Sequence, residues 1–292
     1  MCDEHMSVSV FCPGHISGYF LPVLTQDPDA SGSCGAGIVP DRGVTVTVSH
    51  ADTYTFLGRQ YHHDGTIISR LDSSYIIEDL VHEMGVIAFV CSETDLPLLS
   101  GYGLSAAALL ATAHGINRLF HLGLSDDACA RYAHRIEIKH KTGLGDVAAC
   151  RGGGWVCRRK PGINSDIIRT YDNGEIAVLT LGPMTTADVL SDSHLVERLR
   201  RAVPDKCPQT CQELFSASRH FAEKSGFLSD HLKDIIISCS ESGIESSMTM
   251  LGDGVFAYGQ GAAAFLSQWG EVHCMHISKT GPVIISDDTG DV

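Results

Sequence analysis

Residues 100–107 form a glycine-rich stretch that leads directly into a run of helix-forming residues ending near Phe120. Two glycines and a serine before such a run predict a tight loop and then a helix, whose first backbone N–H groups lack partners within the helix. Peptide dipoles add partial positive charge there, and Gly101 and Gly103 have no Cβ, so a phosphate group could approach the backbone closely. The residues of this predicted phosphate loop are Ser100, Gly101, Tyr102, Gly103, Leu104, Ser105, Ala106 and Ala107. The alternative is an ordinary helix start that contains glycine and serine.

A second glycine-flanked segment, residues 140–146, ends in a single carboxylate, Asp146. An aspartate after such a turn can project into a cleft. If the phosphate loop holds a nucleotide, Asp146 could orient a substrate hydroxyl and accept its proton as the phosphoryl group moves, acting as the catalytic base. The alternative is that Asp146 caps a short helix that begins at Val147.

Transfer of a phosphoryl group from a nucleotide needs a divalent cation that bridges phosphate oxygens. A carboxylate and a hydroxyl are sufficient protein ligands for Mg²⁺, which keeps much of its water shell. Glu137, near the end of a predicted helix, and Ser105 in the phosphate loop are the candidate ligands. Glu137 is equally compatible with a solvated charge at a helix end.

Several predicted elements must position these residues. Alternating polar and apolar residues predict strands over 7–11 and 44–48, and the glycine-rich segments 12–18 and 32–38 between them are expected to be loops. Hairpins are expected over 54–69 and 167–181, the first with His62 and His63 in its turn rather than as metal ligands. Helices are expected over 74–84, from the phosphate loop to 120, and over 125–137, 186–203, 208–224, 229–238 and 262–269; further strands are expected over 86–91, 247–251, 255–258, 272–277 and 283–286.

The order of these elements favours the α+β class, because hairpins and helices are mixed without regular strand–helix alternation. Three consecutive glycines at 152–154 suggest a break in the chain. We therefore expect two domains, residues 1–158 and 159–292.

Composition excludes several partners. The chain has 35 acidic and 21 basic residues among 292, for a formal charge of −14, which disfavours binding to nucleic acid or to anionic membranes. No apolar run approaches the roughly 20 residues of a membrane-spanning helix, and the first residues lack the pattern of a signal peptide, so a cytoplasmic location is expected. The 11 cysteines are expected to be reduced thiols, and Cys207 with Cys211 is a weak zinc signal.

Three motifs, taken in order, resemble those of the GHMP kinases. They are Pro13-Gly14-His15, the phosphate loop, and residues 140–146 followed by the glycines at 152–154. Segments 13–20, 32–44 and 140–147 are most similar to archaeal members of this superfamily that phosphorylate pantoate. Two departures stand out. The usual loop of the superfamily reads Gly-Leu-Gly-Ser-Ser-Ala, whereas here Gly103-Leu104 is followed by Ser105-Ala106-Ala107. A lysine common in the first motif of some members has no counterpart, because His15 follows Pro13-Gly14.

The resemblance implies ATP-dependent phosphorylation of the 4-hydroxyl group of pantoate on the archaeal route to coenzyme A, with Mg²⁺. It implies an N-terminal domain like ribosomal protein S5 domain 2 and a ferredoxin-like C-terminal domain, with the nucleotide in the cleft between them. By position, the phosphate loop would bind ATP, Asp146 would match the catalytic aspartate, and Glu137 would match the magnesium-binding glutamate. A homodimer is compatible with the family.

Pantoate carries a carboxylate, so its pocket should offer a cation or a cluster of N–H donors. The candidate substrate-binding residues are His15, Arg42, His140 and Lys141, with Arg42 or Lys141 favoured for the carboxylate; backbone N–H groups of 33–37 are an alternative. Two other functions remain open. One is a sister kinase for an alcohol such as homoserine or mevalonate, and the other is a non-catalytic regulator that binds nucleotide or metabolite. The presence of Asp146 favours an enzyme.

Overall fold

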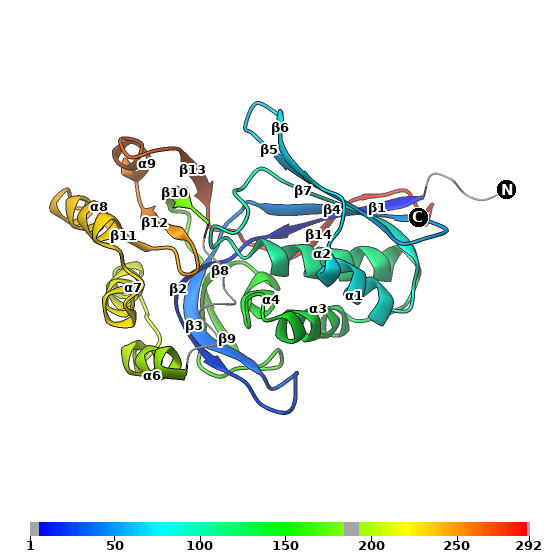
Figure 1. The fold of residues 1–292 in the computed structure, drawn as a ribbon, viewed down its shortest axis with the longest axis horizontal. Coiled ribbons are helices and arrows are strands. Elements are labelled where there is room, and N and C mark those ends of the chain that lie inside the picture. The colour runs from blue at the N-terminus through cyan, green and yellow to red at the C-terminus, as the bar shows by residue number, and fades with distance from the viewer. Residues whose placement is uncertain (1–5, 184–192, 291–292) are drawn as a thin grey trace.

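A computed structural model describes residues 6–183 and 193–290. Within these residues the strands form one six-stranded and two four-stranded sheets, and helices cover them (Figure 1). The α+β class predicted from the sequence is confirmed.

The six-stranded sheet has the order β14-β1-β4-β7-β5-β6. Its strands are β1 (Ser7–Pro13), β4 (Gly43–His50), β5 (Thr55–Tyr61), β6 (Ile67–Leu71), β7 (Ala88–Thr94) and β14 (Val283–Asp287). Helices α1 (Tyr75–Glu83), α2 (Leu104–Leu119) and α3 (Asp126–His140) lie on one side of it (Figure 1). Helix α2 packs against β1 and β4, and its many alanines allow this close approach. A Cβ on Gly115 would lie only 2.8 Å from the Val48 side chain.

A curved four-stranded sheet corrects one prediction. The segments 12–18 and 32–38, expected to be loops, lie largely in strands: β1 runs to Pro13, β2 spans Ile16–Val23 and β3 spans Gly32–Val39. The sheet is completed by β8 (Gly154–Arg158) and β9 (Ile167–Thr170). The glycines serve close packing rather than turns, since a Cβ on Gly37 would lie 2.6 Å from His15 Nε2.

The third sheet has the order β11-β12-β10-β13. Together with its helices it lies at the end of the molecule away from the six-stranded sheet, on the left in Figure 1. Its elements are β10 (Glu175–Gly182), β11 (Glu245–Met248), β12 (Asp253–Tyr258), β13 (Val272–His276), α6 (Ser193–Ala202), α7 (Cys211–Ser225), α8 (Asp230–Glu241) and α9 (Ala262–Leu266). The hairpin expected over 167–181 is wrong, because β9 pairs with β8 whereas β10 pairs with β12 and β13. The first part of the helix expected over 186–203 lies outside the described residues.

The division of the chain at 158/159 stays a prediction. Strands β9 and β14, which come after residue 158, both pair with strands before the boundary. Strand β9 pairs with β8, which ends at Arg158, and β14 pairs with β1. The C-terminal strand thus returns to the first sheet, where it forms an edge.

The expectation of reduced cysteines is wrong for one pair. Cys157 on β8 and Cys207 after α6 form a disulfide, with their Cα atoms 5.9 Å apart. Helix α6 packs against β2, which lies in the same sheet as β8, and the segment after α6 brings Cys207 to Cys157; nothing in the spacing of the two cysteines along the chain indicates this. Because Cys207 is oxidised, it is not available to bind zinc together with Cys211.

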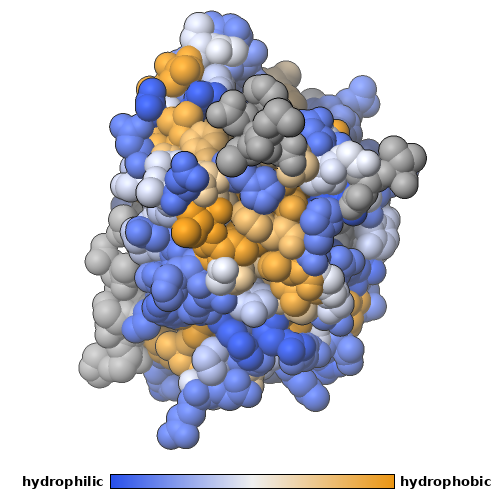
Figure 2. All heavy atoms as spheres, turned by 90° about the vertical axis from the view of Figure 1, so that its right-hand side faces the viewer, coloured by the Kyte–Doolittle hydropathy of each residue, from blue (hydrophilic) through white to orange (hydrophobic). Residues whose placement is uncertain are grey.

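Surface features bear on the expected partners. Among the described helices, none is both long and apolar enough to cross a lipid bilayer. Apolar side chains gather in the middle of the face on which the chain termini lie (Figure 2). Ile284 and Ile285 of the edge strand β14 are 44% and 57% exposed. The homodimer stays a prediction.

Candidate active site

One pocket of about 570 Å³ contains residues of both predicted motifs. Seven of the eight phosphate-loop residues line it, from Ser100 to Ala106, whereas Ala107 is fully buried. Its wall also includes His15, Ser17, Ser33, His140, Lys141, Thr142, Gly143, Asp146, Met250 and Leu251. The fold therefore brings the phosphate loop and Asp146 to the same cavity.

Helix α2, which follows the phosphate loop, has no side-chain cap at its N-terminus from any described residue. Gly103 is the N-cap of α2 in the left-handed region, with φ 63°, and no side chain in the described structure bonds to the first turn, which has no acidic residue. Gly101 also has positive φ, 81°. A Cβ on Gly103 would lie 3.0 Å from the backbone nitrogen of His15, so the loop needs glycine there. These features match an anion-binding helix N-terminus.

The Tyr102 side chain anchors this loop. It is 1% exposed, and its hydroxyl lies 2.9 Å from the hydroxyl of Thr180 on β10. The Tyr102 carbonyl accepts a hydrogen bond from the backbone N–H of His15, at 2.8 Å. Tyr102 therefore fixes the loop between two sheets through its ring and its backbone.

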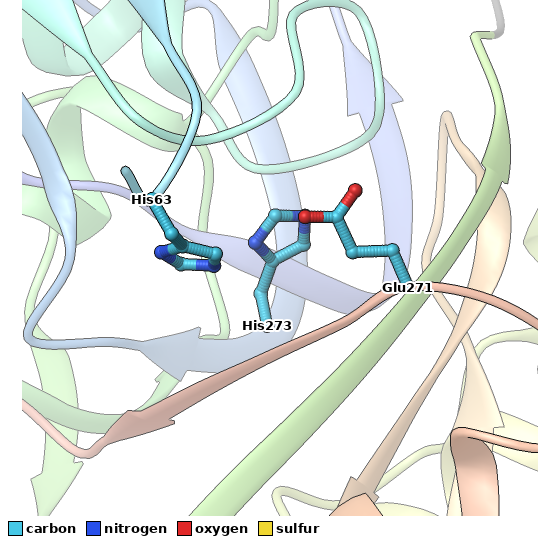
Figure 3. Close-up of side chains that lie close together, drawn as sticks. All are labelled: His63, Glu271 and His273. Atoms are coloured by element: carbon cyan, nitrogen blue, oxygen red, sulfur yellow. The ribbon is translucent and has the colours of Figure 1, made fainter. Parts of the chain in front are cut away.

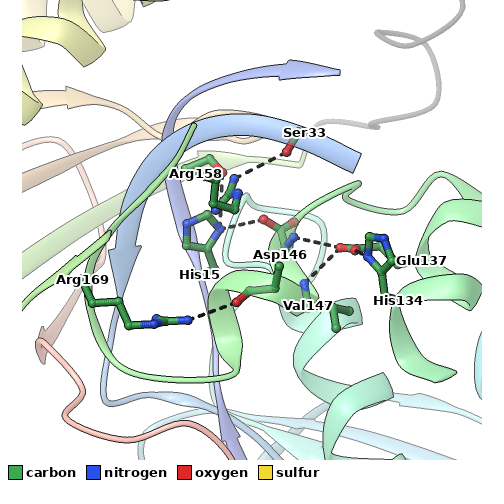
Figure 4. Close-up of polar contacts among 10 residues, drawn as sticks. His15, Ser33, His134, Glu137, Asp146, Val147, Arg158 and Arg169 are labelled. Carbon is green, nitrogen blue, oxygen red and sulfur yellow. Dashed lines mark hydrogen bonds and ion pairs between the residues drawn. The ribbon is translucent and has the colours of Figure 1, made fainter. Parts of the chain in front are cut away.

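Asp146 is the first residue of α4 (Asp146–Cys150), and Gly145 is the N-cap. The alternative that Asp146 caps this helix is wrong, since its side chain makes no capping bond. Its Oδ1 instead lies 2.7 Å from His15 Nδ1 (Figure 4), and its side chain is 15% exposed. A carboxylate held in this way at a pocket wall can accept a proton from a bound alcohol.

His15 orients that carboxylate. The side chain is fully buried, and burial lowers the pKa of His15 although the hydrogen bond to Asp146 opposes this shift. A neutral imidazole donates its Nδ1–H to Asp146. The other ring nitrogen, Nε2, then carries no proton, and it has no hydrogen-bond partner among the described residues. His15 was expected to bind substrate; its ring contacts Asp146 instead, while the residue still lines the pocket.

Glu137 lies behind Asp146, at 0% exposure. Its Oε1 accepts the backbone N–H groups of Asp146 and Val147, at 2.9 and 3.2 Å, and so caps α4 (Figure 4). Its Oε2 lies 3.2 Å from His134 Nδ1. The alternative of a solvated helix-end charge is wrong. Glu137 is absent from the pocket wall, so its predicted role as a metal ligand would require it to give up one of these bonds.

His134 links Glu137 to the first half of the chain. Its two ring nitrogens face two acceptors, Glu137 Oε2 and the carbonyl of Ser31, the latter at 3.0 Å from Nε2. Burial lowers the pKa of His134, but the hydrogen bond to Glu137, the charge of Glu137 and the hydrogen bonds to the backbone of Ser31 and Pro28 together outweigh burial, and the net pKa is raised.

A raised pKa in the folded state makes stability depend on pH. The contribution of His134 is fully present below its unfolded pKa of roughly 6.5 and is lost as pH rises through the higher folded value. We expect the free energy of unfolding to decrease over that window, and to decrease less in His134→Gln. Urea unfolding at several pH values tests this; identical pH dependence in both proteins would contradict the assignment.

Arg158, at the end of β8, was not among the predicted site residues. It is 3% exposed, its Nη2 lies 3.5 Å from Ser33 Oγ, and its Nε and Nη1 have no hydrogen-bond partner in the described structure. It lies beside His15 and Asp146 (Figure 4). A buried guanidinium with free N–H groups is costly unless an anion joins it. Its place directly after the apolar residues 155–157 is the signal that could have identified it.

The other predicted substrate-binding residues are dispersed. Arg42 does not line the pocket and pairs with Asp95, at 2.6 Å. Lys141 lines the pocket and is exposed, with positive φ of 54° at the C-cap of α3. His140 also lines it, and its Nε2 lies 2.6 Å from Asp79 Oδ2. The preference for Arg42 has no support in this geometry.

Comparisons with known proteins point to one family. Residues 74–154 match the model of the GHMP kinases N terminal domain. A pantoate kinase of Methanospirillum hungatei is 45% identical over 97% of this chain and 98% of that protein. A pantoate kinase of Thermococcus kodakarensis is 33% identical over 86% of this chain and 87% of its own. A solved structure described as a phosphotransferase related to the CoA biosynthesis pathway is 26% identical, with a TM-score of 0.80 over 96% of this chain and 98% of that one.

Proposed function

Because this chain belongs to the pantoate kinase family of the GHMP kinases, we propose that it transfers the γ-phosphoryl group of ATP to the 4-hydroxyl group of pantoate. One observation carries the proposal: the uncapped N-terminus of α2 and the carboxylate of Asp146 line the same pocket. The product, 4-phosphopantoate, would be an intermediate on the archaeal route to coenzyme A.

The phosphate loop binds the triphosphate of ATP through the backbone N–H groups at the start of α2. The absence of acidic residues in the first turn and the glycines at 101 and 103 support this assignment. Met250 and Leu251 also line the pocket, and the Met250 carbonyl lies close to Gly101, so a backbone segment between β11 and β12 contacts the same loop.

Mg²⁺ would supply positive charge that offsets the negative charge of the phosphate groups. The donor set fits a hard cation, because the hydroxyl of Ser105 lines the pocket and makes no hydrogen bond in the described structure. Ser105 would hold the ion together with phosphate and water. Glu137 acts on the site mainly through Asp146, whose backbone it holds.

Asp146 accepts the proton of the pantoate hydroxyl as that oxygen attacks the γ-phosphorus. His15 holds Asp146 Oδ1, and Glu137 fixes the first turn of α4, so the base keeps one orientation. Arg158 does not itself line the pocket, but its Nη2 lies 3.5 Å from the hydroxyl of Ser33, which does; a small shift of this side chain would let Arg158, with Ser33, bind the carboxylate of pantoate through its free N–H groups. This replaces Arg42 as the favoured carboxylate ligand.

An assay of ADP release from the purified protein with ATP, Mg²⁺ and a panel of alcohols tests the function. We expect turnover with pantoate and little with homoserine or mevalonate. Turnover with homoserine and none with pantoate would assign a sister activity. Binding of nucleotide without turnover of any alcohol would support the regulator instead.

Replacing Ser105 with alanine tests the cation site. Loss of one oxygen ligand worth about 1.4 kcal/mol should raise the Mg²⁺ concentration for half-maximal rate by about tenfold. Initial rates at fixed ATP across a Mg²⁺ series measure this, and binding of a fluorescent nucleotide with and without Mg²⁺ gives a second readout. Ser73→Ala, at an exposed serine of the same pocket wall, is the control. An unchanged Mg²⁺ dependence in Ser105→Ala would refute the role.

We also propose that the enzyme works in the cytoplasm, where ATP and Mg²⁺ are available, and that it forms a homodimer. The exposed apolar side chains of β14 support an interface at this edge strand. Light scattering of the purified protein distinguishes monomer from dimer.

A further inference from the structure

Three potential ligand side chains meet away from the active-site pocket. His63 lies in the turn between β5 and β6, Glu271 immediately precedes β13, and His273 lies on β13. One ligand atom from each lies within 4.8 Å of the others. Figure 3 shows the His273 ring between the His63 ring and the Glu271 carboxylate. None of the three lines the pocket that contains Asp146.

His273 is the residue that points to a ligand. It is 4% exposed, and its Nδ1 has no hydrogen-bond partner within the described residues. Leaving a buried polar atom unpaired is costly, and such atoms are rare in native proteins. The neighbouring ring of His63, with its centroid 5.4 Å away, is tilted by 45° rather than stacked.

The surrounding charges leave Glu271 available. No hydrogen bond or ion pair in the described part of the chain occupies its carboxylate, and both Glu271 and His63 are exposed. Arg42, the cation whose charge acts on His273, is itself paired with Asp95 at 2.6 Å. The cluster is therefore open to solvent on one side and is not already neutralised by a side-chain cation.

We propose that His63, Glu271 and His273 bind one divalent transition-metal ion of the Zn²⁺ class. Two imidazoles and one carboxylate are a common ligand set for such ions, and a water completes the tetrahedron. Ligand atoms in such a site are about 3.3 Å apart, so the set must contract by up to roughly 1.5 Å, which the exposed His63 and Glu271 side chains allow.

The ion would join two sheets. His63 belongs to the hairpin β5–β6 of the six-stranded sheet, whereas Glu271 and His273 belong to the edge of the third sheet. The His273 ring makes an edge-on contact with Tyr102, with centroids 6.1 Å apart. Metal binding would thus hold together the two sheets between which the phosphate loop is anchored.

The proposal is tested with the full chain, freed of metal by a chelator and without nucleotide. Titration calorimetry should show one high-affinity Zn²⁺ site per chain. At 100 times the dissociation constant, Zn²⁺ should raise Tm by roughly 5–10 °C. His63→Ala and Glu271→Gln should each weaken binding at least tenfold and remove the Tm shift, while His62→Ala, in the same exposed turn, should behave as the unchanged protein.

Thiols are the competing ligands, and Cys274 is exposed beside His273 in sequence. Alternation along β13 directs it to the opposite face. Co²⁺ distinguishes the two cases: the proposed site gives the visible bands of nitrogen and oxygen ligands, which persist in Cys274→Ser, without an intense sulfur charge-transfer band. Absence of binding at 100-fold excess of Zn²⁺ over protein, binding unaffected by His63→Ala and Glu271→Gln, or a sulfur band lost in Cys274→Ser would each overturn the proposal.

Discussion

Replacing Asp146 with asparagine is expected to lower kcat by roughly 10²–10⁴-fold, the range for removal of a general base. The variant keeps the shape of the side chain and a hydrogen-bond acceptor for His15 Nδ1, whereas an amide cannot take the proton of the pantoate hydroxyl. Because α4 is capped by Glu137 and not by Asp146, the helix should remain formed. ATP affinity should change little, since the phosphate loop is untouched.

The measurement pairs steady-state kinetics with nucleotide binding. Asp234→Asn, at an exposed position of α8, is the matched control and should retain normal turnover. If Asp146→Asn turned over normally, the base would have to be sought elsewhere on the pocket wall. If it lost ATP binding as well as turnover, Asp146 would belong to the nucleotide site.

Replacing Arg158 with methionine should reduce kcat/KM for pantoate by roughly 10²–10³-fold, with most of the change in the KM for pantoate. The guanidinium offers two unpaired nitrogens, Nε and Nη1, and charged hydrogen bonds from such groups are worth about 1.5–3 kcal/mol each. Stability should not fall correspondingly, because exchanging a buried, poorly paired charge for an apolar side chain of similar length is often neutral or stabilising. A purely structural arginine would show the reverse pattern.

Kinetics with pantoate varied at saturating ATP, together with urea unfolding, separate these possibilities. Arg158→Lys should recover only part of the affinity, because an ammonium lacks the planar fork that matches a carboxylate. Arg159→Met, the exposed neighbour, serves as control. An unaltered KM for pantoate in Arg158→Met would exclude the carboxylate role.

Local chemistry made several features predictable. The start of α2 is encoded within a few residues, because glycines at 101 and 103 followed by helix formers specify a loop and a helix whatever surrounds them. The N-caps at Ser125 and Ser229 follow from the same short-range logic. The α+β class and the approximate positions of most helices were accessible for this reason.

Glycine content predicts the wrong element where the role of the glycines is long-range. At positions 32–38 glycine permits strands to approach closely, as a Cβ on Gly37 would meet the backbone of Ile16 on the paired strand β2 and the ring of His15 just before that strand. The same composition in isolation is typical of loops. The disulfide between Cys157 and Cys207 was equally hidden, because the 50-residue separation carries no information about proximity.

The sequence alone determined which groups could do the chemistry: a helix start able to bind phosphate and an aspartate able to act as a base. Tertiary structure decided their partners, placing His15 against Asp146 across 131 positions, turning Glu137 inward as a helix cap, and burying Arg158 beside them. The physical reason is one of range. Loop and helix propensities act over a few residues, whereas burial and hydrogen-bond partners depend on segments that meet only when the sheets pack.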